Sequence, residues 1–338
     1  MKINFSKIDF KKPSSLIVLL CCALTFFAGG ILIHLLRGQD SHRYVFQVKP
    51  GMSSHEVATQ LKQKELISSE FMFLLLAKIE MKADSIKAGD YELTTQMTTF
   101  DIINTLTSGQ TIARRITIPE GYTINQIAQL LEEQNLGSAA VFKQLAKSYA
   151  PYDYMTTTNP NLLYHAEGFV FPDTYSISSG MTEQQILKML VGQFDKKVTP
   201  EMRRKAAEKG INVYQLTILA SLVEREARLG AERPIIAGVF INRLRQNMPL
   251  QSCATIQYIL GTPKAELSIQ DTEINSPYNT YLHYGLPPGP IANPGIASLQ
   301  AVVDAAPTEY LYFVASSNGS HQFSKTYEEH LAAIERAN

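Results

Sequence analysis

Cysteine is scarce in this chain, which has three Cys among its 338 residues. Three cysteines are too few for a disulfide framework or a zinc ribbon. An excess of charge of either sign is also missing, because 31 Lys plus Arg balance 31 Asp plus Glu. A neutral chain offers no basic surface of the kind that attracts nucleic acid, so we expect no nucleic-acid partner.

Several catalytic signatures are absent too. The sequence contains no His-Glu-x-x-His, no Cys-x-x-Cys, no Gly-x-Ser-x-Gly, no Ser-x-x-Lys and no phosphate-binding glycine loop. These absences disfavour metalloproteases, serine hydrolases, penicillin-binding enzymes and nucleotide-dependent enzymes. The seven His are scattered without the spacing of metal ligands. We therefore expect neither a metal nor a cofactor.

One long apolar segment is present near the N-terminus, at Leu16–Leu36 (LIVLLCCALTFFAGGILIHLL). A helix of about 20 such residues spans a bilayer. The preceding lysines favour a cytoplasmic N-terminus, so we expect a cytoplasmic tail over 1–13, a single transmembrane helix over 14–37 and an outward-facing remainder. The alternative is a cleaved signal peptide, whose apolar region is normally about 7–15 residues and ends at a small-x-small site.

A strand–turn–helix pattern recurs after this segment. Residues 44–48 alternate like a strand, Gly51 marks a turn, and Ser53 with Glu56 has the spacing of a capping box. The same pattern returns at 115–126, with Gly121 in the turn. With a further strand at 89–93 and a short helix from Thr98, residues 44–112 predict a small strand–helix–strand–helix module. Two interpretations stay open: a generic spacer, or a glycan-binding module that resembles LysM.

Residues 113–338 predict a larger domain. Periodicity is helical over 181–260, and a strand at 310–314 and a helix near 327–336 close the chain. Residues 138–161 are irregular and predict a loop or a short helix. The fold class that we predict is α+β: a transmembrane helix, the LysM-like module over 44–112 and a mixed α+β catalytic domain over 113–338.

Two acids lie at the rim of an apolar helix predicted over 213–227. Glu224 and Glu226 flank the same apolar face about 80° to either side, so periodicity does not choose between them. Because apolar surroundings disfavour the charged form of a carboxyl group, such an acid can protonate a glycosidic oxygen. The alternative is a helix-end Glu paired with Arg225, Arg228 or Arg233.

Three further segments combine aromatic, acidic and turn-forming residues. They are EGFVFPDTY at 167–175, SPYNTY at 276–281 and GLPPGPIANPG at 285–295. Aromatic rings and acids together suit sugars, which have apolar faces and hydroxyl rims. Prolines preset the backbone and can hold side chains in place at a small entropic cost. A buried loop that caps the domain is the alternative.

Taken together, these blocks resemble the endolytic murein transglycosylase family (MltG, YceG-like). The resemblance runs from about Glu167 to the C-terminus, and the anchor and the LysM-like module match the family's layout. It rests on the three segments above and on further blocks in the family's order: ASLVERE at 220–226, VFINRL at 239–244, LQSCATIQYILG at 250–261, and 310–314 with His321, Phe323, Thr326 and His330.

The resemblance implies a lyase of the bacterial inner membrane with a periplasmic catalytic domain. Such an enzyme cleaves the β-1,4 bond between N-acetylmuramic acid and N-acetylglucosamine within nascent peptidoglycan strands and leaves 1,6-anhydro ends, which terminates elongation. The family also suggests a link to peptidoglycan synthase complexes. Its catalytic Glu corresponds to Glu224. Our candidates for holding the sugar are Asn242, Arg243, Gln251, Tyr278, Asn279 and Thr280.

The chain departs from the family at one position. Cys253 and Ala254 stand where the family often has Asp followed by Pro or Ala. Two rival functions follow from the sequence. One is a membrane-tethered scaffold that binds peptidoglycan without chemistry, and the other is a glycoside hydrolase that uses Glu224 with Glu226, Asp173 or Asp271.

Overall fold

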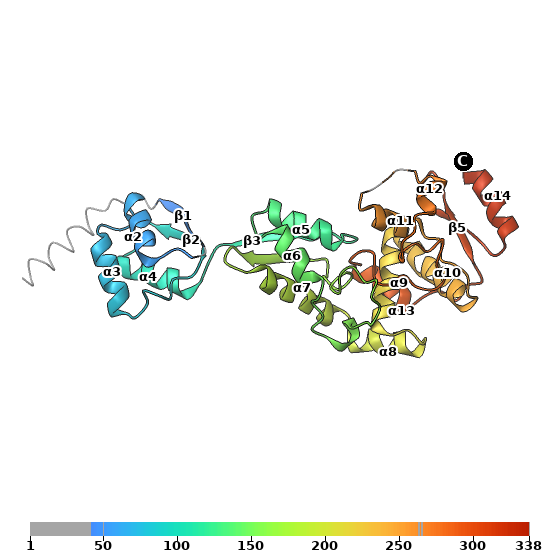
Figure 1. Ribbon diagram of the computed structural model, residues 1–338, viewed down its shortest axis with the longest axis horizontal. Coiled ribbons are helices and arrows are strands. Elements are labelled where there is room, and N and C mark those ends of the chain that lie inside the picture. Colours follow the sequence, from blue (N-terminus) through green and yellow to red (C-terminus); the bar gives the residue numbers. More distant parts are fainter. Residues whose placement is uncertain (1–41, 50, 263, 265, 338) are drawn as a thin grey trace, which may run out of the picture. The chain divides into compact units, whose positions relative to one another are not determined.

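The computed structural model describes residues 42–49, 51–262, 264 and 266–337 (Figure 1). The chain divides into two compact units between Ile112 and Ala113. Each unit combines helices with a small antiparallel sheet, which confirms the predicted α+β class. No helix among the described residues combines the length and apolar character that crossing a bilayer requires. The predicted membrane helix over 14–37 lies outside the described residues.

The N-terminal unit is built on one antiparallel strand pair. Strand β1 (Arg43–Val48) pairs with β2 (Gly89–Thr94), and Phe46 lies opposite Tyr91. The described residues of the unit also form three helices: α2 (Ser54–Gln63), α3 (Glu70–Ile79) and α4 (Thr99–Ser108). The predicted order of strand, helix, strand and helix therefore needs one addition, because α3 follows α2. The glycan-binding interpretation of this module stays a prediction.

Capping boxes start two of these helices. Ser53 Oγ accepts a hydrogen bond from Glu56 N at 3.3 Å, and Ser53 N donates to the Glu56 carboxylate at 2.8 Å. Thr98 and Asp101 repeat the arrangement at the start of α4. Such boxes satisfy backbone N–H groups that the first helical turn leaves free. The core behind them is apolar and contains Phe46, Leu61, Phe73, Tyr91, Leu93 and Ile102.

The C-terminal unit contains the remaining elements. Strand β3 (Ala113–Thr117) pairs with β4 (Thr174–Ser178), and β5 (Tyr312–Ala315) pairs with β6 (His321–Ser324). The helices are α5 (Ile124–Glu133), α6 (Ala139–Ala146), α7 (Glu183–Lys197), α8 (Pro200–Glu208), α9 (Val213–Glu226), α10 (Arg233–Arg245), α11 (Cys253–Leu260), α12 (Ile269–Thr272), α13 (Ile296–Val303) and α14 (Tyr327–Ala337). A short helix, α6, thus occupies part of the segment predicted as a loop or short helix.

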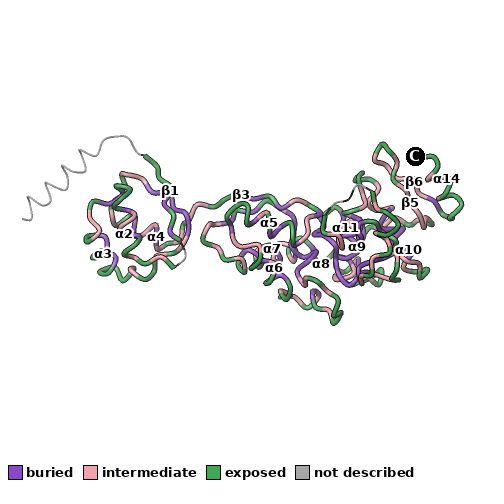
Figure 2. The backbone as a smooth tube through the Cα atoms, turned by 45° about the horizontal axis from the view of Figure 1, so that its top comes forward, coloured by how far each residue is buried: buried purple, intermediate pink, exposed green. Residues whose placement is uncertain are grey.

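Helix α9 runs through the interior of this unit (Figure 2). Its residues from Leu216 to Val223 are all buried, and it contacts α8, α10, α11 and α13. Burial on all sides explains why apolar residues nearly encircle the helix. The polar residues Glu224 to Glu226 follow directly at its C-terminal end. The core around α9 therefore fixes the positions of Glu224 and Glu226.

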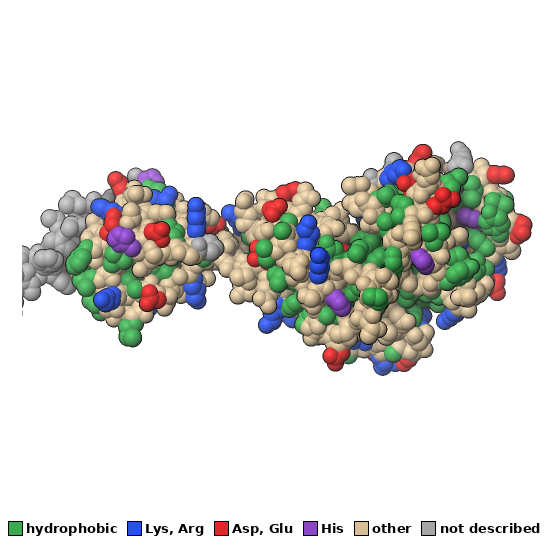
Figure 3. Space-filling model, viewed as in Figure 1, with side chains coloured by type: hydrophobic (Ala, Val, Ile, Leu, Met, Phe, Trp, Pro, Cys, Tyr) green, Lys and Arg blue, Asp and Glu red, His purple; other side chains and the backbone are tan. Residues whose placement is uncertain are grey.

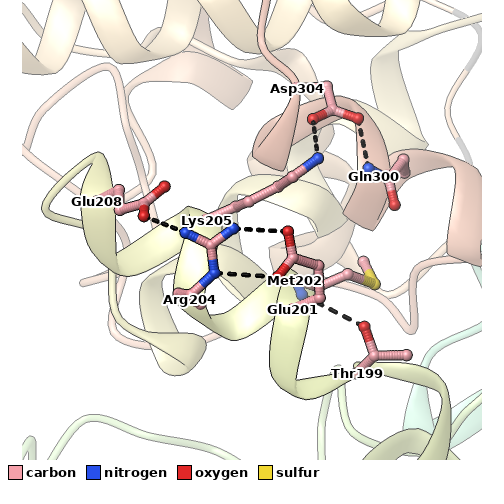
Figure 4. A network of polar contacts seen from close by, with 8 residues as sticks. All are labelled: Thr199, Glu201, Met202, Arg204, Lys205, Glu208, Gln300 and Asp304. Atoms are coloured by element: carbon pink, nitrogen blue, oxygen red, sulfur yellow. Dashed lines mark hydrogen bonds and ion pairs between the residues drawn. The ribbon is translucent and has the colours of Figure 1, made fainter.

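Polar side chains join α8 to the end of α13 (Figure 4). Lys205 Nζ lies 3.5 Å from Asp304 Oδ1, and Gln300 also donates to the Asp304 carboxylate. On α8 itself, Arg204 pairs with Glu201 and Glu208. This network is exposed, so its contribution to stability is small, but it links two of the helices that pack on α9. Elsewhere on the face in Figure 3, charges of both signs and hydrophobic side chains are interspersed.

Candidate active site

Glu224 lies in the last turn of α9 with 8% of its side chain exposed. Its Oε2 accepts hydrogen bonds from Gly295 N at 3.0 Å and from Ser298 Oγ at 2.7 Å. Both donors belong to the start of α13, where backbone N–H groups are free and the helix dipole favours negative charge. The end of one helix thus meets the beginning of another, and the Glu224 carboxyl lies between them.

Arg233, the first residue of α10, completes the surroundings of this carboxyl. Its Nη2 lies 3.9 Å from Glu224 Oε1, and its Nε donates to Ser298 Oγ at 3.2 Å. Ser298 therefore bridges the acid and the arginine. Arg233 was one of three arginines that the sequence offered as partners for a helix-end Glu, and it is the one that forms the ion pair with Glu224.

A second acid, Glu120, reaches the same place from the turn before α5. Its carboxyl fills the space beside the Cα of Gly295, so that a Cβ at residue 295 would overlap it. Burial raises the pKa of the Glu120 carboxyl, the charge of Glu224 raises it further, and Arg233 lowers it. The two carboxyl groups therefore converge on one glycine, whose N–H binds Glu224 and whose missing side chain makes room for Glu120.

Backbone hydrogen bonds hold the Glu120 turn against the loop before α13. Gly121 N donates to Asn293 O, and Asn293 N donates to Tyr122 O, both at 2.9 Å. Arg225 Nη1 adds a longer bond of 3.4 Å to Gly121 O. Gly121 has a φ of +76°, which favours glycine, so the turn in this shape requires glycine after Glu120.

A third acid, Glu167, lies fully buried behind the turn. Its carboxylate accepts hydrogen bonds from Ile124 N and Asn293 Nδ2 at 3.0 Å and from Tyr258 Oη at 3.1 Å. Burial raises its pKa to about 8, against the opposing effect of these donors. Glu167 thereby joins α5, α11 and the loop before α13, and its contacts support the Glu120 turn.

The other acid of α9, Glu226, points to a different partner. Its Oε1 accepts from Ser252 Oγ in a short hydrogen bond and from Ala254 N at 3.4 Å, so it binds the start of α11. Asp173 and Asp271 are bonded elsewhere: Asp173 accepts from Gln193 Nε2, and Asp271 pairs with Lys264. Of the acids that the hydrolase alternative names beside Glu224, none contacts it among the described residues.

A small cleft is lined in part by Arg225. Its lining mixes polar and apolar residues and includes Thr123, Asn125, Gln126 and Gln257, with Tyr258 and Ile291. Amides, a hydroxyl and an aromatic ring suit the hydroxyl rims and apolar faces of sugars. Arg225 directly follows Glu224 in the sequence, but neither Glu224 nor Glu120 lines this cleft.

The structure gives Arg243 internal partners. Its side chain is buried, its Nε donates to Leu311 O at 2.6 Å and its Nη1 to Leu250 O at 2.9 Å. The guanidinium lies over the Tyr312 ring at 5.1 Å, and burial lowers its pKa. Arg243 thus fixes the loop after α10 to the strand pair β5–β6.

Asn242 and Gln251 lie near this arginine. Asn242 Nδ2 donates to Thr308 O at 2.7 Å and to Tyr310 O at 3.1 Å. Gln251 is exposed and has a φ of 49°, which is uncommon for a residue with a side chain. Its N donates to Thr280 O at 3.0 Å. An exposed side chain on a constrained backbone leaves Gln251 the most accessible of the six predicted sugar ligands.

Tyr278, Asn279 and Thr280 are buried and organise their own loop. Asn279 Nδ2 donates to two backbone carbonyls of the preceding residues, each at 2.9 Å. Thr280 Oγ1 accepts from Ser252 N at 3.0 Å, and the Tyr278 ring packs 5.2 Å from that of Tyr258. These contacts hold the loop together and join it to α11. A direct role of the six residues in sugar binding stays a prediction.

Sequence reasoning missed Glu120 as a site residue and treated Glu120-Gly121 only as a turn. One signal was available in the recurring pattern. Aligning Gly51 with Gly121 places Pro50 opposite Glu120, so an acid replaces a residue that commonly shapes turns. Ser298 and Gly295 carried no such signal, since their importance comes from contacts with Glu224, more than 70 residues away in sequence.

These features define a class: an α+β protein with a carboxyl-based site suited to acid–base chemistry. The particular family follows from comparison with known proteins. The family model described as the YceG-like family matches residues 46–336, and the chain belongs to that family.

Named relatives agree with this membership. The chain is 35% identical over 323 residues to an endolytic murein transglycosylase of Bacillus subtilis (strain 168), covering 92% of this chain and 89% of the relative. It is 32% identical to one of Streptococcus pneumoniae (strain D39), covering 86% of this chain and 58% of that longer protein. The crystal structure of a YceG-like protein from Listeria monocytogenes is also similar, with a TM-score of 0.59, 32% identity, and coverage of 87% of this chain and 99% of that one.

Proposed function

We propose that the chain is an endolytic murein transglycosylase, a lyase that cuts within the glycan strands of peptidoglycan. Its full-length relatives carry that name. One structural observation supports the proposal above the others: Glu224 is largely shielded from solvent and is held by two hydrogen-bond donors. A shielded and oriented carboxyl group is what general acid–base catalysis on a glycosidic bond requires.

In the proposed mechanism, Glu224 first acts as an acid. Its proton goes to the glycosidic oxygen that leaves from C1 of N-acetylmuramic acid. The resulting carboxylate then takes the proton from the C6 hydroxyl of the same sugar, and O6 bonds to C1. The product is a 1,6-anhydro end, and no water is consumed. Gly295 N and Ser298 Oγ are placed to stabilise the carboxylate between the two transfers.

The intramolecular nucleophile has two consequences. It brings the proximity advantage of a reaction within one molecule. It also removes the need for a second carboxyl group as nucleophile or base, which glycoside hydrolases require. The proposal therefore needs one acid that both gives and takes a proton, and Glu224 is our assignment for it.

Location and partners belong to the same proposal. We infer a single-pass anchor at 14–37 in the bacterial inner membrane, with the catalytic unit on the periplasmic side. From there the enzyme would cut nascent strands, end their elongation and contact peptidoglycan synthase complexes. The LysM-like module would add affinity for glycan. The apolar run at 16–36 and the preceding lysines support the topology.

The decisive experiment compares Glu224→Gln with Glu226→Gln in digests of intact sacculi, with mass spectrometry of the released ends. The two acids are on the same helix and each binds a serine, so the second variant is a matched control. We expect Glu224→Gln to lower formation of anhydro ends by about 10³-fold, and Glu226→Gln to retain activity within a few-fold. Equal activity of wild type and Glu224→Gln would contradict the proposal.

The same digests separate the rival functions. A scaffold without chemistry releases no fragments from wild type while it still binds sacculi. A hydrolase releases reducing ends, which are heavier by one water than anhydro ends. Anhydro ends that disappear in Glu224→Gln, with sacculus binding retained, are expected only of the transglycosylase.

A further inference from the structure

We propose that Glu120 acts on the reaction through Glu224, as a positioning residue in a carboxyl pair that holds a single proton. This inference rests on the proposed function, because it assigns a role in the same reaction. Nothing in the mechanism above requires a second acid, yet the fold brings one to Glu224.

The geometry carries the proposal. Gly295 N donates to Glu224 Oε2 at 3.0 Å, and the Glu120 carboxyl occupies the space that a side chain at 295 would fill. On the other side, a Cβ on Gly121 would lie 3.6 Å from Glu224 Cγ. Glu120 and Glu224 therefore approach each other around two glycines, and any larger residue at 295 would collide with the Glu120 carboxyl.

Glu120 has no local partner that would explain its position. Among the residues that the structure describes, none donates a hydrogen bond to its carboxyl or forms an ion pair with it within 4.0 Å. The buried Glu167, by contrast, is supplied with three donors, whereas Glu120 is an exposed residue whose carboxyl lies against Gly295. An acid that faces another acid without donors of its own favours sharing a proton.

The surrounding charges favour one proton on the pair. Arg233 is the cation that faces both acids, and Arg225 is directed to Gly121 O. Glu232, next to Arg233, is hydrogen-bonded to His321. The backbone N and the Nδ1 of His321 lie 3.0 and 2.7 Å from the Glu232 carboxylate. Two carboxylates beside one arginine leave an uncompensated negative charge, which one bound proton removes. The raised pKa of Glu120 agrees with this balance.

The proton balance of the reaction is unchanged by Glu120. Glu224 gives its proton to the glycosidic oxygen and regains one from the C6 hydroxyl, so no proton is gained or lost overall. While Glu224 is a carboxylate, the Glu120 charge disfavours that state and promotes return of the proton. The same repulsion keeps the pair protonated, and therefore competent as an acid, at higher pH.

The test is the pH profile of kcat/KM for anhydro-end formation by the full chain. In Glu120→Gln we expect the alkaline limb to move to lower pH by about one unit. Activity on the acidic side should stay within about threefold, while activity at pH 8 should fall about tenfold. Glu120→Asp keeps the charge and should keep the limb near its wild-type position. Glu133→Gln, at an exposed acid on α5, is the control and should leave the profile unchanged.

A purely structural role predicts something different: Glu120→Gln would lower kcat/KM equally at every pH. An unmoved alkaline limb would therefore overturn the inference, while loss of anhydro ends in Glu224→Gln would still support the proposed function. Absence of anhydro ends from wild type would instead overturn the proposed function itself. If Glu120→Gln does not fold, carbon-13 NMR of wild type provides the test: the two carboxyl signals must share their titration steps, and independent steps refute the pair.

Discussion

Selected carboxyl groups of the two units lie in contrasting surroundings. In the N-terminal unit, Glu56 and Asp101 lie at exposed helix starts, where hydrogen bonds from Ser53 and Thr98 lower their pKa. In the C-terminal unit, Glu167 is buried and its pKa is raised to about 8, while partial burial and the charge of Glu224 raise the pKa of Glu120, which is exposed. The same type of side chain thus serves as a cap at Glu56 and Asp101 and as a proton-holding group at Glu167.

The contrast between exposed caps and buried carboxyl groups helps to locate a functional site on physical grounds. A surface cap stabilises its helix, so its presence needs no function. An inward carboxyl disfavours folding unless it is protonated or well supplied with donors. Glu167 is such a carboxyl: it has donors, but its pKa stays high. A buried acid that lowers stability when it is ionised therefore indicates a functional site more specifically than a large number of acids does.

The largest expected effect concerns the pH dependence of stability. Because the pKa of Glu167 is about 8 in the folded protein and its ordinary value is about 4.5, this group stabilises the fold fully below pH 4.5. That stabilisation is lost as pH rises to about 8, by an amount on the order of a few kcal/mol. Glu167→Gln should flatten the free energy of unfolding of the C-terminal unit over this window in urea titrations. If the free energy of unfolding depends on pH in the same way in wild type and in Glu167→Gln, a group other than Glu167 binds the proton.

A deletion in the N-terminal core should follow in size. Leu61 is fully buried, so Leu61→Ala should lower the free energy of unfolding of its unit by about 3 kcal/mol. Hydrogen exchange on the full chain should then accelerate over 42–112 and stay unchanged over 113–338. Val45, which is 64% exposed, is the control: Val45→Ala should change little. Faster exchange in both units would show that their stabilities are coupled.

Gly295→Ala should affect activity more than stability. The φ of residue 295 is −74°, so alanine fits the backbone, but its Cβ would displace the Glu120 carboxyl. Misplacement of a catalytic group by about 1 Å can lower the rate about 100-fold, and we expect a loss of this order in anhydro-end formation. Gly192→Ala, with open space around its Cβ, should retain wild-type activity. Full activity in Gly295→Ala would argue against the packed carboxyl pair.

The smallest expected effect is on a helix cap. Ser53→Ala removes the acceptor for Glu56 N and should destabilise the N-terminal unit by about 1 kcal/mol. Ser138 also precedes a helix but makes no side-chain cap bond, so Ser138→Ala should be nearly neutral. Melting temperatures of the two variants give the comparison. The cap's carboxylate has a lowered pKa, so its contribution is present above pH 4.5 and declines as pH falls, opposite in sign to Glu167.

Local signals predicted those parts of the fold that are determined locally. Capping boxes and alternating residues indicated α2, α4, α5 and the strands β1 to β3 with bounds close to those observed. Helix α3 was not predicted, because its sequence EFMFLLLAKI is apolar on most sides and shows no amphipathic stripe. Its start depends on Ser69, which caps Met72 N, a single residue in a polar stretch.

The site was predictable only in part, because long-range contacts create it. Helical periodicity placed Glu224 and Glu226 at equivalent positions beside the apolar face. Their surroundings differ because Glu224 binds Ser298 and Glu226 binds Ser252, each outside α9. The spacing of residues in the sequence also does not show whether a polar side chain is free to bind a ligand or is hydrogen-bonded within the protein. Arg243 and Asn279 have the composition of sugar ligands, yet their donors are directed to backbone carbonyls.

The hydrogen bonds between the Glu120 turn and Asn293 have a consequence for biosynthesis. Tyr122 and Asn293 are 171 positions apart, and Ser298 comes later still. A ribosome must therefore synthesise the chain past Ser298 before these residues can meet, and contacts of such long range form slowly. A shorter nascent chain would carry Glu224 without its donors Gly295 and Ser298, so it would lack the assembled site.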